Sequence, residues 1–383
     1  MKIMLRSFSV LALSLVICAV LMAEGQTELQ GGTKYVGRET CVECHEEIYG
    51  TFMKSGHPWK LNKVVNNQPP DYPYTELPEL PMGYTWRDIS YVIGGYNWKA
   101  RFIGKDGFII TGPAGDEPYG AQYNFANPVV GNEPGWVPYH QGERKAYNCG
   151  PCHTTGYSNS EPDSHQDDLP GLVGTWSEPG VQCESCHGPA SLHVADPQGA
   201  RLVVDRSSAQ CGECHYRGAP EVVDAKGGFI KHHEQYEELF QSKHVALDCV
   251  LCHDPHAGVI QLRKAGVQTT RVSCENCHFK EAKYQASEVM KEMVSCIECH
   301  MPRVTKSAVG NKATYTGDIR THLMAIDATL TDQFTEDGKF ALSQIGLDFA
   351  CKSCHVAGGS ATVQTDAALI QEAYNYHARP EKL

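Results

Sequence analysis

The longest run of hydrophobic positions in this 383-residue chain lies near its start. The run extends from about Phe8 to Met22, is preceded by Lys2 and Arg6, and is followed by polar residues. A short basic segment before an apolar stretch is typical of a secretory signal peptide. We expect residues 1–23 to be removed by cleavage after Ala23, so that the mature chain is exported.

Two alternatives for this segment are weaker. A retained membrane anchor would need a longer apolar run, and no second stretch of spanning length follows. Lipid attachment at Cys18 would require a small residue before it, where the chain has the bulky Ile17. Leu21 is larger than the residue usual three positions from a cleavage site, so the point of cleavage is the less certain part of the prediction.

Residues 88–112, DISYVIGGYNWKARFIGKDGFIITG, have the pattern of strands. Apolar side chains alternate around Trp98, Ala100 and Phe102, and a turn at Lys105–Gly107 leads into Phe108–Ile110. This pattern predicts a β-hairpin. We interpret it as a small scaffold module, with a partner-docking edge as the alternative.

Helical patterns are short. Residues 279–295 predict one short helix between two cysteine motifs, and residues 232–244, HHEQYEELFQSKH, have helix-forming composition. On one helix His233 and His244 would be about three turns apart and would share a face. After Met301 the pattern loosens. The 36 Gly and 21 Pro indicate long loops elsewhere.

Charge and composition exclude several classes of protein. The formal net charge of −12 argues against a nucleic-acid partner, because phosphate binding needs a basic surface. The hydrophobic content is ordinary, which excludes a multi-span membrane protein. The unusual feature is 17 Cys together with 18 His, since cysteines in this number imply disulfides, metals or thioether-bound haem.

Sixteen of the cysteines belong to one repeated motif, C-x-x-C-H, which occurs eight times. The copies are Cys41, Cys44 and His45; Cys149, Cys152 and His153; Cys183, Cys186 and His187; Cys211, Cys214 and His215; Cys249, Cys252 and His253; Cys274, Cys277 and His278; Cys296, Cys299 and His300; and Cys351, Cys354 and His355. The seventeenth cysteine is Cys18, so the mature chain has none left over.

C-x-x-C-H is the attachment signature of haem c. The two thiols form thioethers to one porphyrin, and the adjacent histidine becomes the proximal ligand of the iron. Four zinc ribbons or eight local disulfides are the alternatives. Neither needs a histidine after every second cysteine, whereas all eight motifs have one. We therefore predict eight covalently bound haems c.

The remaining histidines predict the second axial ligands. Removing His165, which lies in an acidic loop, leaves the candidates His57, His140, His193, His232, His233, His244, His256, His322 and His377, of which His232 and His233 are neighbours that we expect to supply one ligand. His193 lies six residues after His187 and His256 three after His253, so we expect each to reach the haem of a different motif.

An iron with two histidine ligands has no open position and exchanges electrons without binding a substrate. No C-x-x-C-K motif, which marks the catalytic haem of some multihaem reductases, occurs in the chain. We therefore predict an electron carrier and not an enzyme. The predicted fold is haem-dominated: mostly irregular loops with short α-helices and one small β-hairpin module, with the haems forming the core.

We divide the mature chain into three regions by motif spacing. Residues 24–145 hold the first haem and the hairpin, residues 146–300 are haem-dense with six haems, and residues 301–383 form a C-terminal region with the eighth haem.

The motif run with CESCHGPASLH, CVLCHDPHAGV and CIECHMPR resembles the multihaem c-type cytochromes over nearly all of the mature chain. Residues from about Tyr35 to His193, with YVIGGYNWKARFIGKDGFIITG, YNCGPCHTTGY and GTWSEPGVQCESCHGP, are similar to exported cytochromes of metal-reducing bacteria that polymerise into conductive extracellular filaments. That resemblance implies a possible homopolymer in which a distal histidine comes from a neighbouring subunit, with His57 or His377 as the natural candidate.

These patterns together predict an electron-transfer protein that serves redox partner proteins or extracellular electron acceptors. We expect it outside the cell or at the cell surface, with the periplasm as the alternative, and with no membrane span after signal cleavage. An octahaem reductase or oxidase of small nitrogen or sulfur compounds with one open haem is the second hypothesis. A docking subunit of a separate enzyme is the third.

Overall fold

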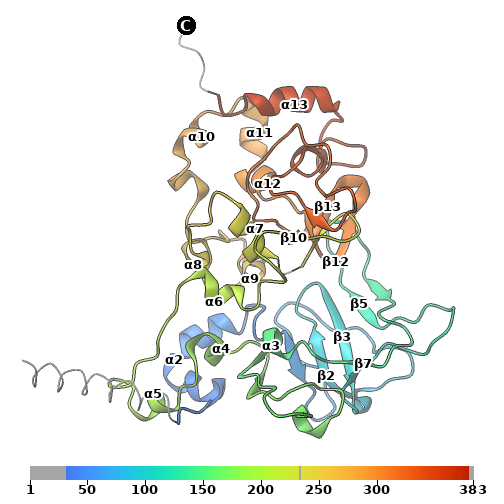
Figure 1. The fold of residues 1–383 in the computed structure, drawn as a ribbon, viewed down its shortest axis with the longest axis vertical. Coiled ribbons are helices and arrows are strands. Elements are labelled where there is room, and N and C mark those ends of the chain that lie inside the picture. The colour runs from blue at the N-terminus through green and yellow to red at the C-terminus, as the bar shows by residue number, and fades with distance from the viewer. Residues whose placement is uncertain (1–31, 233, 379–383) are drawn as a thin grey trace, which may run out of the picture.

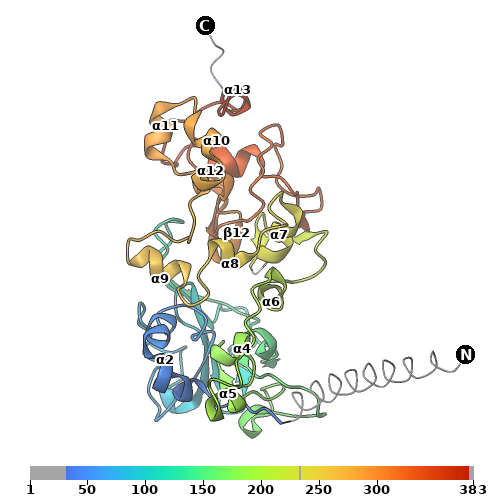
Figure 2. The ribbon, with the colours of Figure 1, turned by 90° about the vertical axis from the view of Figure 1, so that its left-hand side faces the viewer.

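The computed structural model describes residues 32–232 and 234–378. The predicted signal peptide and His233 lie outside these residues. The described chain forms two halves stacked along the long axis of the molecule, with residues up to about 205 in one half and the later residues in the other (Figures 1 and 2). Within the described ranges, no helix is long and apolar enough to cross a membrane.

The first half contains a seven-stranded sheet with all strand pairs antiparallel. Its strands are β1 (Leu61–Lys63), β2 (Ile89–Gly94), β3 (Lys99–Gly104), β4 (Phe108–Ile109), β5 (Gln122–Asn124), β6 (Gly135–Val137) and β7 (Lys145–Ala146). The order is β1-β2-β3-β4-β7, with β5 pairing β3 and β6 pairing β5. Most of these strands have two or three residues, which is too short to show alternation in the sequence.

The predicted hairpin is confirmed as β3–β4, where Ile103 faces Ile109. Gly107 closes its turn by donating its N–H to the Gly104 carbonyl at 3.0 Å, with a φ of 82°. A Cβ at Gly107 would lie 2.9 Å from the Cβ of Leu169, so both conformation and space require glycine. The prediction of one isolated hairpin is wrong, because the hairpin belongs to the larger sheet.

Both faces of this sheet are buried. Tyr91, Ile93 and Ile103 pack in one cluster, while Val92 and Phe102 pack in another, as expected from the two-residue period of a strand. A third cluster in the second half includes Phe229, Ile230, Leu323 and Phe349. Side-chain cores therefore exist, which corrects the prediction that the haems alone form the core.

The helices are short, as predicted. They are α2 (Arg38–Phe52), α3 (Gly150–His153), α4 (Cys183–His187), α5 (Ser191–Ala195), α6 (Ser208–Gly212), α7 (Gln235–Gln241), α8 (Cys249–Cys252), α9 (Val259–Lys264), α10 (Phe279–Lys283), α11 (Glu288–Met293), α12 (Cys296–His300) and α13 (Asp366–Tyr374), with the 3-10 turns η1 (Trp86–Asp88), η2 (Gln166–Asp168), η3 (Cys274–Asn276) and η4 (Lys312–Thr314) and the π-turn η5 (Asp348–Lys352). Every C-x-x-C-H motif lies on or at one of these turns. A helical turn brings residues i and i+3 to the same side, so it points both thiols of a motif the same way.

Two helix predictions are wrong. Residues 279–295 form α10 and α11 instead of one helix. Helix α7 ends at Gln241 because the Ser242 hydroxyl donates to the Leu239 carbonyl at 2.9 Å and accepts from the His244 N–H at 3.0 Å. His244 therefore lies beyond the helix, contrary to the prediction, and His233, its predicted neighbour on one helical face, lies outside the described residues.

The second half contains small sheets where the sequence predicts loops. Strands β11 (Ile230–Lys231), β12 (Thr305–Asn311) and β13 (Thr316–Ile319) form one sheet, β10 (Val223–Asp224) pairs β14 (Phe340–Ala341), and β8 (Thr154–Thr155) pairs β9 (Glu178–Pro179) in the first half. A register shift in β12 is held by buried Asp318, whose carboxylate accepts the N–H groups of Ser307 at 2.6 Å and Ala308 at 2.7 Å. Because hydrogen bonds to the Asp318 carboxylate hold this strand, its sequence has no hydrophobic pattern that would predict it.

Candidate haem-binding sites

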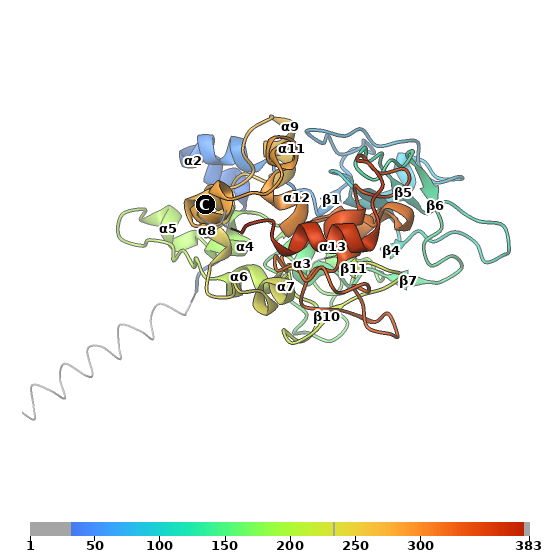
Figure 3. The same cartoon turned by 90° about the horizontal axis from the view of Figure 1, so that it is seen from above.

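One continuous cavity of about 3660 Å³ runs through both halves of the molecule. Its lining includes all sixteen motif cysteines, all eight motif histidines and seven further histidines: His57, His193, His232, His244, His256, His322 and His377. A site for one small ligand measures roughly 300–1,000 Å³, so this space fits several large groups. Viewed down the long axis, the motif helix α4 lies on the opposite side of the molecule from strands β5 and β6 (Figure 3).

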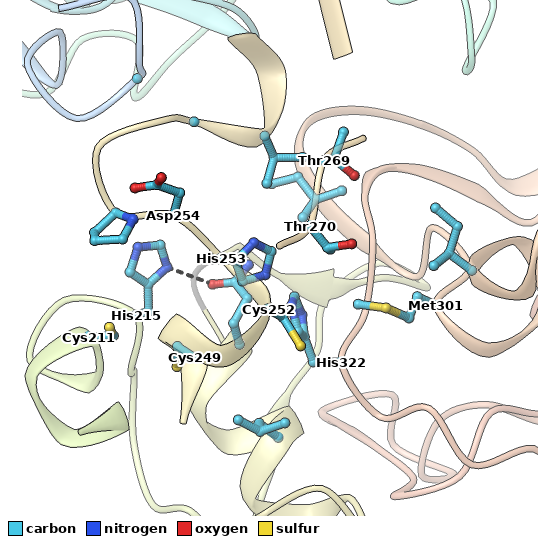
Figure 4. Close-up of a pocket in the computed structure, with 18 of the residues that line it drawn as sticks. Cys211, His215, Cys249, Cys252, His253, Asp254, Thr269, Thr270, Met301 and His322 are labelled. Carbon is cyan, nitrogen blue, oxygen red and sulfur yellow. Dashed lines mark hydrogen bonds between the residues drawn. The ribbon is translucent and has the colours of Figure 1, made fainter. Parts of the chain in front are cut away.

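The site around His253 shows the local arrangement (Figure 4). Cys249 and Cys252 come from α8, and His253 follows them directly. The ring of His322, from the loop after β13, lies with its centroid 6.1 Å from that of His253. Two thiols and two imidazoles, drawn from segments about 70 residues apart in sequence, therefore converge on one place.

The same pairing of a motif histidine with a second histidine occurs six times. The centroid distances are 6.4 Å for His45 and His193, 6.4 Å for His215 and His57, 6.2 Å for His187 and His256, 5.8 Å for His278 and His244, 6.1 Å for His253 and His322, and 6.1 Å for His300 and His377. Bonds of about 2 Å between a metal and imidazole nitrogen place the centroids of two imidazoles on one metal about 6 Å apart. The donor sets thus fit iron held between two histidines.

His193 and His256 each lie beside the histidine of a motif other than the nearest one in sequence, as the sequence predicts. His193 lies beside His45 and not beside its near neighbour His187, and His256 lies beside His187 and not beside His253. His57 and His377 each lie beside a motif histidine of their own chain. Both therefore have a motif histidine beside them within the chain, and a ligand that crosses between subunits stays a prediction.

The chain also holds these imidazoles in the state that metal binding requires. Several ring Nδ1 atoms bond backbone carbonyls: His300 to Met324 at 2.9 Å, His355 to Thr362 at 2.8 Å and His193 to Ala200 at 3.1 Å. This contact orients the ring and leaves Nε2 for the metal. Burial lowers the pKa of His57 to about 3 and that of His253 to about 4, so both rings are neutral, as metal ligands must be.

The site at His153 differs from these six. Burial, and then the charges of Lys60 and Arg217, lower the pKa of His153 to about 3. His232 lies near His153. Burial, and then the charges of Lys99 and Arg217, lower the pKa of His232 to about 2, and the charge of His153 is among the smaller causes. The His232 Nε2 is 3.5 Å from the Arg217 Nη2. The structure therefore places His232 near His153, with the basic side chains of Lys99, Arg101 and Arg217 near both.

Two histidines stay away from the cavity. His140 lies between β6 and β7, with its Nδ1 2.8 Å from the Glu143 carboxylate, and it is not part of the lining. The assignment of His140 as a distal ligand, which came from counting histidines, stays a prediction. His165 bonds the Leu172 carbonyl at 2.7 Å, away from the cavity, as expected of a loop residue.

The cysteines show which motifs are neighbours. Helix α2 packs against α4 and α6 against α8, and the thiols lie near enough to shift one another's pKa in four pairs: Cys41 and Cys183, Cys152 and Cys214, Cys211 and Cys249, and Cys274 and Cys296. The Gln210 side chain donates to the Cys186 carbonyl at 2.7 Å, Cys252 lies near Cys274 and Cys277, and Cys299 lies near Cys351 and Cys354. The motifs thus follow one row, first–third–fourth–fifth–sixth–seventh–eighth, with the second beside the fourth.

Buried carboxylates support the row, and the sequence gives no sign of them. Glu184, inside the third motif, accepts the N–H groups of Gly37 at 2.9 Å and Ala190 at 2.8 Å. Glu238 accepts the hydroxyls of Thr305 at 3.2 Å and Thr321 at 3.1 Å, together with the N–H of His322. An acidic residue on a short amphipathic helix is usually solvated, so only the fold reveals these roles.

The alternatives to haem find no matching geometry. All sixteen motif cysteines are free thiols, with no disulfide among them. In the part of the chain that the structure describes, no three His, Cys, Asp or Glu side chains come together in a way that could hold a metal ion directly. A zinc ribbon needs four such ligands around one point.

Comparison with known proteins agrees with this geometry. The model of the family "Cytochrome c554 and c-prime" matches residues 136–188, which hold the second and third motifs. The octaheme sulfite reductase MccA of Wolinella succinogenes has a similar structure, with a TM-score of 0.57 and 18% identity over 90% of this chain and 71% of that chain. The outer cell wall cytochrome OcwA has a TM-score of 0.51 and 18% identity over 88% of this chain and 86% of that chain. No curated protein sequence matches.

The fold is therefore that of the multihaem c-type cytochromes. Those two solved structures are an enzyme and a cell-wall cytochrome, so the fold alone does not separate catalysis from electron transfer.

Proposed function

We propose that this chain is an electron-transfer protein that carries eight covalently bound haems c in a single row with one branch. The observation that carries the proposal is the set of six histidine pairs with centroids 5.8–6.4 Å apart, each beside a pair of motif thiols. When bound, haem iron supplies one-electron redox chemistry. The chain's part is to hold each iron between two imidazoles and to place neighbouring motifs in contact.

The chain also supplies counter-charges. Lys60, Lys99, Arg101 and Arg217 surround His153 and His232, and burial lowers the pKa of Lys99 to about 7. Buried cations are costly unless paired, and each haem brings two propionates. These side chains are therefore suited to neutralise propionates beside the branch.

The two ends of the row lie in different halves of the molecule, which would allow electrons to enter in one half and leave from the other. The first motif lies on α2 in one half, and the seventh and eighth motifs lie at α12 and η5 in the other (Figure 1). Such a row can serve a soluble shuttle or the end-to-end contacts of a filament. We infer export to the cell surface or exterior from the predicted signal peptide, with the periplasm as the alternative.

The experiment is to purify the native protein and measure its mass, its haem content and its spin states. Eight haems per chain with mostly low-spin irons, together with images by electron cryo-microscopy, would support the proposal and separate filaments from discrete particles. A chain whose mass shows no thioether-bound groups, or fewer than eight, would overturn it.

A second candidate function is a reductase of small nitrogen or sulfur compounds at the branch. The observation that favours it is the group of four basic side chains around His153, since anionic substrates would be attracted there. Cyanide, nitrite and sulfite titrations of the holoprotein test this candidate. A spectral change that disappears in C149S/C152S would favour it, and no change with any of these anions would argue against it.

A further inference from the structure

We propose that a haem iron held at His355, the last of the row, would receive no second histidine from the described residues and would bind small uncharged ligands. The inference rests on the proposed function, because it assumes that Cys351 and Cys354 carry a haem. It assigns a ligand-binding site to one motif of the eight, at a place that neither the motif pattern nor the fold comparison singles out.

The first argument is the distribution of histidines. Six motif histidines have a ring partner at 5.8–6.4 Å, and His153 has His232 nearby. These seven partners account for every described histidine of the cavity lining outside the motifs. In the described ranges, none is left to face His355.

The second argument is that His355 itself is built as a ligand. It lines the cavity, and its Nδ1 bonds the Thr362 carbonyl at 2.8 Å, the arrangement seen at His300. Cys351 and Cys354 begin at the η5 turn and also line the cavity. The proximal side of this site is therefore complete in the same way as the others.

The third argument concerns the chemistry of the surroundings. Helix α13 contributes Leu369, Ile370, Ala373 and Glu372 to the cavity lining, and the negative charge of Glu372, which raises the pKa of Cys351, would repel an anion. The nearby cation Lys352 is already paired, with Asp348 at 3.0 Å and Asp366 at 2.9 Å. Because no unpaired charge of the described residues is available to attract an anion, the site favours uncharged ligands, in contrast to the basic surroundings of His153.

The fourth argument is position. The η5 turn packs against helix α12, which carries the seventh motif, and Cys351 and Cys354 are among the groups that raise the pKa of Cys299 in that motif. The eighth site is thus the end of the row, and electrons entering at any other motif reach it through the seventh. A ligand-accepting iron at this end would be the outlet of the row.

The test uses the full-length holoprotein with its haem content determined first. The reduced protein is titrated with carbon monoxide, and the oxidised protein is examined by electron paramagnetic resonance for high-spin iron. We expect one carbon monoxide bound per eight haems and one high-spin signal. In C351S/C354S, which retains seven motifs, both the binding and the signal should fall to zero.

Three variants separate this inference from its rivals. In H140A and H165A, neither spectrum nor carbon monoxide binding should change; a new carbon monoxide site in either would show that the histidine ligates the iron from a second copy and would overturn the proposal. In C149S/C152S, carbon monoxide binding should persist, and its loss would place the site at the branch instead. Eight low-spin irons without carbon monoxide binding would overturn the inference alone, whereas a chain with fewer than eight haems would overturn the proposed function.

Discussion

The imidazole rings of His187 and His256 lie nearly parallel, with an interplanar angle of 3° and centroids 6.2 Å apart. His187 ends the helix α4 in the first half, and His256 follows the fifth motif in the second half. A single iron between them would join the two halves of the molecule. Under the proposed function, the third site would therefore be both a redox site and a link between the halves.

His256→Ala should leave the iron at His187 with one protein ligand. We expect one low-spin signal to be replaced by a high-spin signal, and one additional carbon monoxide to bind per chain. Electron paramagnetic resonance and gas titration measure both effects. His140→Ala is the matched control, because His140 lies outside the cavity lining; an unchanged spectrum in His256→Ala would contradict the pairing.

Glu238 should set the potential at the fifth site. Its carboxylate is fully buried, and its Oε2 lies 3.7 Å from the His322 Nδ1. A buried negative charge beside an axial ligand stabilises the oxidised iron and lowers the reduction potential. Glu238→Gln removes the charge with little change of shape.

We expect Glu238→Gln to raise the reduction potential of one haem by on the order of 50 mV. For a one-electron couple this shift corresponds to a free energy of about 1 kcal/mol. Potentiometric titration monitored by visible spectroscopy measures the shift. The exposed Glu221→Gln is the control and should leave all potentials in place. A fall in potential, or equal shifts in both variants, would refute the role of Glu238.

Glu184 should stabilise the contact between the first and third motifs. Its two carboxylate oxygens accept three backbone N–H groups, those of Val36, Gly37 and Ala190, at 2.8–3.1 Å. Hydrogen bonds to a charged group contribute about 1.5–3 kcal/mol each, and an amide in its place would turn an NH₂ group toward an N–H.

We therefore expect Glu184→Gln to lower the free energy of unfolding by about 2–3 kcal/mol. Denaturant unfolding measures the loss, and limited proteolysis should show earlier cleavage within residues 32–52. The exposed Glu133→Gln should change stability by less than about 0.5 kcal/mol. Equal stabilities of the two variants would show that the Glu184 contacts contribute little.

The repeated motif predicts the cavity's chemistry because its spacing is local: Cys249, Cys252 and His253 are brought together by one helical turn. The hairpin at Gly107 is predictable for the same reason, since four residues determine the turn. The pairing of His253 with His322 is not local, and counting histidines does not show that His140 lies outside the cavity lining. Only the fold decides which distant loop reaches each site.

The short strands of the sheet and the buried acidic residues could not be predicted from the sequence. Strands β6 and β7 have three and two residues, and backbone pairing with neighbours defines them more than any pattern of side chains. Asp318 holds β12 through backbone N–H groups, and any acidic residue in a loop has the same appearance in the sequence. These features depend on tertiary contacts that no short window contains.

The last prediction concerns the order of the motifs. Cys274 lies near enough to Cys296 and Cys252 for their charges to interact, which places the sixth motif within the row, whereas Cys152 lies beside the fourth motif, with its Sγ 3.9 Å from the Glu213 carbonyl. Removing the sixth haem with C274S/C277S should therefore interrupt the row, while removing the second with C149S/C152S should leave it continuous. Conductance across single molecules held at the two ends should fall at least tenfold in the first variant and change little in the second. Circular dichroism establishes that both variants are folded, and an equal fall in the two would mean that the second motif belongs to the main path.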